Sequence, residues 1–418
     1  MALDPQEFQQ RRLQRQQARE TARRRLRVRL ILAAIALLAC AVIIVLVTRN
    51  ASPAPEPTIP SADTAPAQTE AVQTPPAEAV SSIRIAAVGD VNITQRVVAS
   101  GTTVQDYNNM LLDVSHLLAD PELTLMNLEG VISGPPYGDS RSAPAELIQA
   151  LKNSGIDGVQ LANSYTIHSG ISGLSDTVSA LEEEHLLPLG AYRNKEKPYT
   201  VVNVRGIRIA IAAFTKGTVG MGMLEKGDYG TNILYTDYDT TYQKVDTDRI
   251  QAILSDIRGE KPDLTIALVH WGSEFNDNIS KTQDKIKTIL QEGGVNAIIG
   301  THSHFVQKME LNENGQFIAY SLGDFLGDGT RAGTEYSLIL NLSVEKNNET
   351  GVTRITGFDY TPTFIVNAED QPLKVVRLTE AIAAYEAGQL GRVDEATYNA
   401  MLYALKRVQA RVHPEADK

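Results

Sequence analysis

The chain has 418 residues, 43% of them apolar, which is enough material for a large hydrophobic core. Its net charge of −11 is uneven: ten arginines against three acidic residues give the first 49 residues +7, so the remainder carries −18. The negative charge of residues 50–418 argues against a nucleic-acid partner, because phosphate contacts need clustered lysines and arginines. The single cysteine, Cys40, excludes an intrachain disulfide.

The N-terminal segment has the pattern of a membrane anchor. Residues 30–48 are nineteen consecutive residues without a charge, close to the ~20 that a helix needs to cross a bilayer. Nine arginines precede them, so the positive-inside bias keeps residues 1–29 as a cytoplasmic tail and places the rest outside the cytoplasm. We therefore expect a single-pass protein of the cell membrane. The alternatives are a cleaved signal peptide and a lipoprotein, since residues 37–40, Leu-Leu-Ala-Cys, loosely resemble a lipobox.

The remainder divides into a linker and a folded part. Residues 49–82 are rich in proline, alanine and threonine, which predicts a disordered spacer. From Ile83 onward, short β-rich runs alternate with helical patterns, which predicts an α/β domain. Strands are predicted over 83–91, 123–131, 158–163, 264–272, 296–302, 316–325 and 335–345, with a hairpin around Arg205-Gly206. Helices are predicted over 143–153, 173–185, 244–258 and 281–292, and two more patterns fall within 374–412.

Polar residues able to bind metal or substrate end several of these predicted strands. Open α/β sheets build ligand sites in the loops that follow the carboxyl ends of their strands. The cluster is therefore more informative than any one of its members. In chain order the residues are Asp90, Asn127 with Glu129, Asn163, His270 with Glu274, and His302 with His304.

The most specific signal is His302-Ser303-His304, which follows an apolar strand. In an extended segment, residues two apart point to the same side. The two imidazoles can then hold one ion, or one can bind metal while the other meets substrate. An isolated pair of loop histidines that does neither is the alternative.

The remaining candidates are weaker when taken singly. His270 can equally be a buried histidine bonded to a backbone carbonyl, and Glu274 can ligate, orient His270 or remain solvated. Carboxylate and amide oxygens suit Mg²⁺ or Mn²⁺, while imidazoles suit Mn, Fe or Zn. The mixed set therefore favours one or two divalent ions of Mn, Fe or Zn.

Six short motifs occur in the order of a known family. They are Gly-Asp-Val at 89–91, Asn-Leu-Glu at 127–129, Leu-Ala-Asn at 161–163, His-Trp-Gly-Ser-Glu at 270–274, Gly-Thr-His-Ser-His at 300–304 and Tyr-Ser-Leu-Gly-Asp-Phe at 320–325. This order resembles the poly-gamma-glutamate capsule-synthesis (CapA-like) family of the calcineurin-like metallophosphoesterases. The resemblance covers residues 83–368 and leaves 369–418 as a C-terminal helical extension.

The resemblance implies a four-layer metallophosphoesterase-like β-sandwich flanked by helices, preceded here by the transmembrane helix. It also implies a metal centre at the strand ends. By that carry-over the candidate metal ligands or substrate contacts are Asp90, Glu129, Asn163, His270, His302 and His304. We add Glu274 as a candidate ligand, and we expect the catalytic residues to be Asn163, Tyr165 and His168.

The chain departs from the family pattern at positions that bear on catalysis. Tyr165 stands where the family has a histidine, and His168 stands where the family usually has aspartate. A histidine is a natural general acid near neutral pH, whereas a tyrosine with a pKa near ~10 is a poorer proton shuttle. Ser303 replaces the usual proline, and Asp324 replaces the usual asparagine and adds negative charge near the predicted site.

Two hypotheses follow. In the first, the protein is a metal-dependent hydrolase of the phosphoesterase type that acts outside the membrane on a capsule polymer such as poly-gamma-glutamate. In the second, it is a non-catalytic scaffold in a capsule polymer synthesis or export complex. The expected partners are the cell membrane, the capsule polymer and other polymer-synthesis subunits, with no nucleic acid.

Overall fold

The computed structural model describes residues 79–104, 106–138, 140–193, 197–218, 229–389 and 393–412. The predicted tail 1–29, the membrane segment 30–48 and all but the last residues of the linker 49–82 lie outside these ranges. In the ranges that are described, no helix is both long enough and apolar enough to cross a membrane. Every described element belongs to one compact unit, Pro76–Lys418.

The first sheet joins a parallel half to an antiparallel half. Among the described residues it has eight strands, in the order β19, β18, β17, β1, β2, β5, β6, with β16 also paired to β1. Strands β1, β2, β5, β6 and β16 run parallel, while β17, β18 and β19 are antiparallel. The bounds are β1 Val80–Asn92, β2 Leu123–Glu129, β5 Gly158–Gln160, β6 Leu187–Leu189, β16 Asp324–Leu326, β17 Tyr336–Asn347, β18 Thr353–Val366 and β19 Lys374–Arg377.

The second sheet is built around five parallel strands, β11, β9, β12, β13 and β15. In the described part of the chain it has seven strands, in the order β11, β9, β12, β13, β15, β14, with β8 paired to β9. The predicted hairpin around Arg205-Gly206 joins β8 to β9 and is confirmed. The bounds are β8 Thr200–Val204, β9 Ile207–Thr215, β11 Asn232–Ile233, β12 Leu264–His270, β13 Ala297–Thr301, β14 Met309–Leu311 and β15 Phe317–Ala319. Two small pairs stand apart, β3 Val131–Ile132 with β4 Ser142–Ala143, and β7 Tyr192–Arg193 with β10 Tyr229–Gly230.

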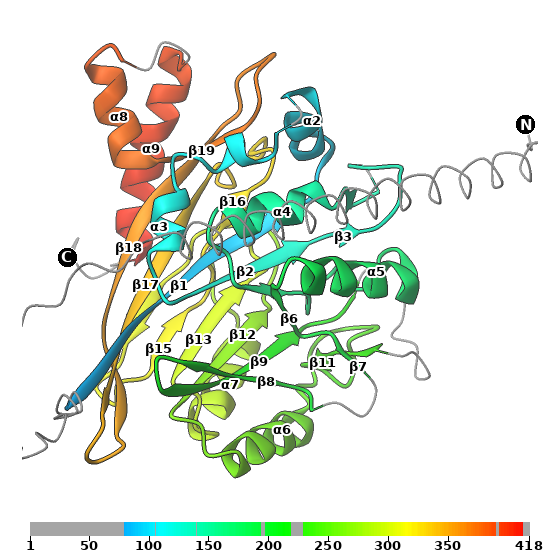
Figure 1. Cartoon of the computed structure of the whole chain (residues 1–418), viewed down its shortest axis with the longest axis vertical. Coiled ribbons are helices and arrows are strands. Elements are labelled where there is room, and N and C mark those ends of the chain that lie inside the picture. Colours follow the sequence, from blue (N-terminus) through cyan, green and yellow to red (C-terminus); the bar gives the residue numbers. More distant parts are fainter. Residues whose placement is uncertain are drawn as a thin grey trace, which may run out of the picture. The chain divides into compact units, whose positions relative to one another are not determined.

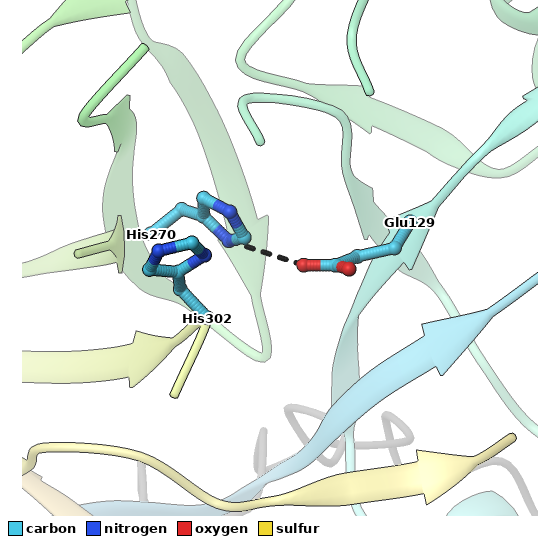
Figure 2. A group of neighbouring side chains, drawn as sticks. All are labelled: Glu129, His270 and His302. Atoms are coloured by element: carbon cyan, nitrogen blue, oxygen red, sulfur yellow. Dashed lines mark ion pairs between the residues drawn. The ribbon is translucent and has the colours of Figure 1, made fainter. Parts of the chain in front are cut away.

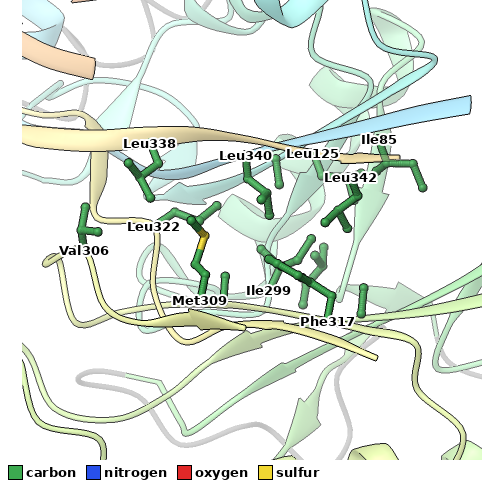
Figure 3. Packing of buried hydrophobic residues seen from close by; sticks show 14 of the residues in the cluster. Ile85, Leu125, Ile299, Val306, Met309, Phe317, Leu322, Leu338, Leu340 and Leu342 are labelled. Atoms are coloured by element: carbon green, nitrogen blue, oxygen red, sulfur yellow. The ribbon is translucent and has the colours of Figure 1, made fainter. Parts of the chain in front are cut away.

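The two sheets pack face to face, with helices on their outer faces (Figure 1). Figure 3 shows the core between the sheets, where Ile85 and Leu340 of the first sheet face Ile299 and Phe317 of the second. Because successive strand residues point to opposite faces, Val88 of β1 belongs to the outer cluster instead. The near-continuous apolar strands reflect this burial on both faces. The predicted α/β class is confirmed, as a sandwich flanked by helices.

The helices divide between the two outer faces. The first sheet is covered by α2 Gln95–Val104, the short 3₁₀ helix η1 Asn108–Met110, α3 Ser115–Ala119, α4 Glu146–Asn153 and α5 Gly170–Glu183. The second sheet is covered by α6 Thr247–Gly259 and α7 Lys281–Glu292. Helix α7 begins with a capping box in which Ser280 and Gln283 bond each other's backbone N–H groups.

The structure differs from the sequence expectation in a few elements. The predicted strand 316–325 divides into β15 and β16, because Gly323 takes a positive φ of 82° between them. Helix α2 was not predicted, since its Gly101, Thr102 and Thr103 have low helix propensity. Strand β18 was not predicted either, since its buried and exposed positions do not alternate regularly.

The C-terminal segment 369–418 contains more than the expected helices. It contributes β19, an edge strand of the first sheet, followed by α8 Leu378–Glu386 and α9 Glu395–Val412. Figure 1 shows both helices beside β18. Leu378 of α8 and Met401 and Val408 of α9 belong to the core between the sheets. The described part of this segment therefore shares the core of the preceding domain.

Candidate metal centre

Strand ends from both sheets meet at one place. Asp90 of β1 lies in register with Asn127 of β2 and with Asp324 of β16. Three polar side chains are thus neighbours in the first sheet, near the carboxyl ends of β1 and β2 and at the start of β16. In the second sheet, His270 ends β12 opposite Thr301, the last residue of β13. The predicted convergence of these strand ends is confirmed.

The first group of metal-binding side chains consists of Glu129, His270 and His302. One donor atom from each lies within 4.8 Å of the others, and all three residues are buried. Figure 2 shows Glu129 pointing from the first sheet toward the two imidazoles, with Oε1 3.5 Å from His270 Nδ1. The rings of His270 and His302 have centroids 4.4 Å apart. This group therefore joins the two sheets.

The first group has donor atoms without partners. Among the described residues, neither ring nitrogen of His302 has a hydrogen-bond partner, and the same holds for Oε1 of Glu129. Burial lowers the pKa of both His270 and His302 well below the usual histidine value, so both imidazoles are neutral. Buried polar atoms without a partner are costly. A cation at this position would satisfy them, so the residues fit a metal ion.

The second group consists of Asp90, His304 and Asp324, which also have donor atoms within 4.8 Å of one another. His304 Nδ1 lies 2.7 Å from Asp324 Oδ1 and 3.7 Å from Asp90 Oδ2. Burial alone would lower the pKa of His304, but the charges of Asp324, Glu129 and Asp90 raise it to about 10. Burial raises the pKa of Asp90 to about 7. Burial likewise raises the pKa of Glu129 and of Asp324. A divalent cation next to these three buried carboxyl groups would favour their ionised forms.

Glu129 lies between the two groups. Its Oε1 faces His270, while its Oε2 lies 4.0 Å from His304 Nε2. A carboxylate with one oxygen toward each group can contribute to two neighbouring ion positions. Asp324, which the sequence marked only as an added charge, completes the second group.

The His302-Ser303-His304 segment is not extended, contrary to the sequence expectation. Strand β13 ends at Thr301, and His302 and His304 have positive φ angles of 90° and 60°. The backbone turn sends His302 to the first group and His304 to the second, with ring centroids 6.3 Å apart. Positive φ is unfavourable for residues other than glycine, and such strain concentrates at functional sites.

Asn163 orients other residues through hydrogen bonds. Its Nδ2 donates to Asn127 Oδ1 at 3.0 Å and to the Leu128 carbonyl at 2.7 Å. Asn127 Nδ2 in turn donates to Asp90 Oδ1 at 2.6 Å. Asn163 Oδ1 accepts from the Tyr165 N–H at 2.9 Å. The structure thus places Asn163 at the start of a series of hydrogen bonds that ends on Asp90.

Predicted site residues Tyr165 and Glu274 line the mouth of the site. A cavity of about 410 Å³ opens onto His304 and Asp324 and has both residues in its wall. Glu274 is exposed and belongs to neither group. His168 is exposed too; its ring meets the Tyr165 ring edge-on at 5.6 Å and is not part of the cavity wall.

Sequence reasoning missed several residues of the site. Ser164 contacts His270 Nε2 through its N–H at 3.2 Å and through its Oγ at 3.1 Å. Arg141 and Arg331 line the cavity, as does Phe275, whose ring stacks on His304 at 5.0 Å. These residues lie in loops, and no strand-end pattern marks them in the sequence.

The chain is similar in sequence to two curated capsule proteins of Bacillus. Capsule biosynthesis protein CapA of Bacillus anthracis is 28% identical over 208 residues, 49% of this chain and 48% of that protein. PGA biosynthesis protein CapA of Bacillus subtilis (strain 168) is 25% identical over 232 residues, 55% of this chain and 56% of that protein. The matches therefore span about half the length of these curated relatives.

Solved structures also match, among them the following two. A structure described as a novel phosphatase, from Mycoplasma pneumoniae, has a TM-score of 0.41 and 13% identity and covers 68% of this chain and 94% of its own. A protein of Thermus thermophilus has a TM-score of 0.35 and 8% identity and covers 67% of this chain and 98% of its own. The family model described as "Bacterial capsule synthesis protein PGA_cap" matches residues 84–329, which include every residue of the two groups. The chain therefore belongs to the PGA_cap family of bacterial capsule synthesis proteins.

Proposed function

We propose that this protein is a membrane-anchored, metal-dependent hydrolase of the phosphoesterase type that acts outside the cytoplasm in the synthesis of a capsule polymer such as poly-gamma-glutamate. The observation that carries the proposal is the pair of adjacent buried groups between which Glu129 lies. A purely structural core would not place so many titratable side chains together, since burying a charge without a counter-charge is costly.

The donor chemistry limits the cofactor. Imidazoles and carboxylates together suit Mn, Fe or Zn, and two groups provide for one or two ions. Glu129, His270 and His302 would hold one ion, and Asp90, His304 and Asp324 a second. A bound divalent cation would supply Lewis-acid polarisation of a phosphoryl or acyl oxygen and would ease deprotonation of water near neutral pH.

The protein's own residues would then orient a metal ligand and protonate the leaving group. The hydrogen bonds from Asn163 to Asn127 and from Asn127 to Asp90 fix the orientation of the Asp90 carboxylate. Burial raises the pKa of Tyr165, so its hydroxyl stays protonated at neutral pH and can donate to a leaving group. Because Tyr165 lines the cavity and the exposed His168 does not, we assign the leaving-group role to Tyr165.

A direct test uses the full-length protein purified in detergent. We expect bound Mn, Fe or Zn by elemental analysis and Mn²⁺-dependent hydrolysis of a phosphodiester, both lost in His302→Ala. His116→Ala, which changes an exposed histidine of α3, is the matched control and should retain both properties. A wild-type protein without metal would contradict the proposal.

The second candidate is the non-catalytic scaffold. Tyr165 favours it, because a residue held protonated is a weak proton shuttle at neutral pH. In this case the protein would bind metal and hydrolyse no ester, while His302→Ala would lose the metal and weaken association with other polymer-synthesis subunits. Metal content combined with turnover therefore separates the two candidates.

The membrane topology is tested independently. Residues 30–48 supply the proposed anchor, and the arginines before them supply the orientation. Protease added to intact wall-stripped cells should digest the domain and leave the N-terminal tail. Protection of the domain would place it in the cytoplasm and contradict the proposal.

A further inference from the structure

Two arginines lie at the mouth of the cavity that opens onto the second group. Arg141, between β3 and β4, places its Cζ 4.4 Å from the centre of the Tyr165 ring. Arg331, between β16 and β17, places its Cζ 3.8 Å from the centre of the Phe275 ring. Both side chains line the cavity of about 410 Å³ together with His304 and Asp324. The mouth is therefore flanked by two guanidinium groups, each held against an aromatic ring.

Neither guanidinium forms an ion pair or a hydrogen bond with any residue that the structure describes. Two of the three acidic residues in the cavity wall are engaged elsewhere. Asp324 pairs with His304, and Asp328 accepts from the N–H and hydroxyl of Thr330. The third, Glu274, pairs with neither arginine in the described part of the chain. The donors of both arginines therefore remain available to a ligand.

Aromatic stacking also limits how the arginines can move. A guanidinium that stacks on a ring keeps its N–H edges free for planar, paired hydrogen bonds to oxyanions. Phe275 stacks in turn on His304 with an interplanar angle of 21°, and its N–H donates to the Ser303 carbonyl at 2.8 Å. Arg331 thus contacts the same aromatic ring that stacks on His304 of the second group.

We propose that Arg141 and Arg331 are substrate-binding residues that recognise anionic groups, carboxylate or phosphate, next to the reacting bond of an acidic chain molecule. The location of that bond rests on the proposed function, whereas the anion-binding role does not need turnover. The net charge of the chain is negative, so the protein as a whole does not attract anions. The two unpaired arginines at the cavity mouth favour an acidic ligand at that one position.

The test measures binding by isothermal titration calorimetry with the full-length protein in detergent and excess Mn²⁺. The ligands are a hexaglutamate peptide, inorganic phosphate and a neutral hexaglutamine peptide. Arg141→Gln and Arg331→Gln should each weaken binding of the recognised anion about tenfold, the usual order for one charge-assisted pair. Lysine at either position should restore part of the affinity, because it keeps the charge and loses the planar fork.

The controls separate recognition from damage. Arg354→Gln removes an arginine of β18 that borders a different cavity and should leave all binding unchanged. Because Arg141 is half-buried, its variant requires a melting curve; Arg331 is exposed, so its variant decides the question if Arg141→Gln unfolds.

Each outcome has a defined meaning. Loss of hexaglutamate binding assigns the pair to carboxylates, and loss confined to phosphate assigns it to phosphate; both support the proposal. Wild-type affinity for both anions in Arg331→Gln, or an equal loss of hexaglutamine binding, overturns it. If anion binding depends on the arginines but no ester is hydrolysed, the hydrolase proposal fails and this one stands.

Discussion

The two candidate metal-binding groups adjoin each other at Glu129 but differ in the charges of their members. Glu129, His270 and His302 combine one carboxylate with two neutral imidazoles whose nitrogens are partly unpartnered. Asp90, His304 and Asp324 combine two carboxylates with an imidazolium held at 2.7 Å by Asp324. The first group is open to a cation, whereas the second already contains its own positive charge. We therefore expect the first group to bind its ion more tightly.

The largest effect is expected at Glu129, a member of the first group whose second oxygen faces the second group. Glu129→Gln removes the charge that faces both ion positions, so it should reduce bound metal at both and lower activity by at least about 100-fold. Metal analysis of the purified full-length variant, alongside turnover, measures both effects. Retention of full metal content would show that Glu129 does not contribute to either position.

A direct comparison of the groups comes next. His302→Ala should abolish the tighter ion, while Asp324→Asn should weaken only the second, because asparagine keeps an oxygen donor near His304. We expect activity to fall by about 100-fold in the first variant and about tenfold in the second. Titration of the metal-free proteins with Mn²⁺ would reveal the difference. Equal losses of both ions in the two variants would contradict independent groups.

A smaller effect on metal binding is expected at Asn163, which is linked to Asp90 of the second group by hydrogen bonds. Asn163→Ala breaks the hydrogen-bonded chain that ends on Asp90, so the second ion should bind about tenfold more weakly while the first is unaffected. Asn163→Asp is unsuitable as a rescue, since it would add a buried charge. Asn153→Ala, on an exposed hydrogen bond near α4, serves as the control in the same Mn²⁺ titration. A loss of the first ion would instead indicate that Asn163 serves the first group.

The smallest effect is expected at the C-terminal helix. Arg407 and Arg411 of α9 both pair with Asp277, two residues from the Phe275 ring that stacks on His304. Because these pairs are partly exposed, Asp277→Ala should lower the free energy of unfolding by only about 1 kcal/mol. Urea denaturation would measure it, with Glu380→Ala, which breaks one exposed pair to Arg377, as the reference. A selective weakening of the second ion would show that α9 supports the loop that carries Phe275.

Much of the site was predictable because strand ends carry a readable signal. An apolar run that ends in Asp90, Glu129 or His270 indicates a polar side chain at the edge of a sheet, and parallel strands gather such edges together. Asn163 was foreseen as a site residue, but the sequence could not show that its amide bonds Asn127. Arg141 and Arg331 could not be foreseen, because loop residues follow no period.

Sequence patterns alone predicted the α/β class and most of the candidate metal ligands that converge, since periodicity and strand-end chemistry are local properties of the chain. The tertiary structure alone decided which donor joins which group. Asp324 meets Asp90 only because β16 pairs with β1 across more than two hundred residues, and the two histidines part only because the backbone turns at positive φ. Such pairings depend on packing between distant segments, which no short window of sequence contains.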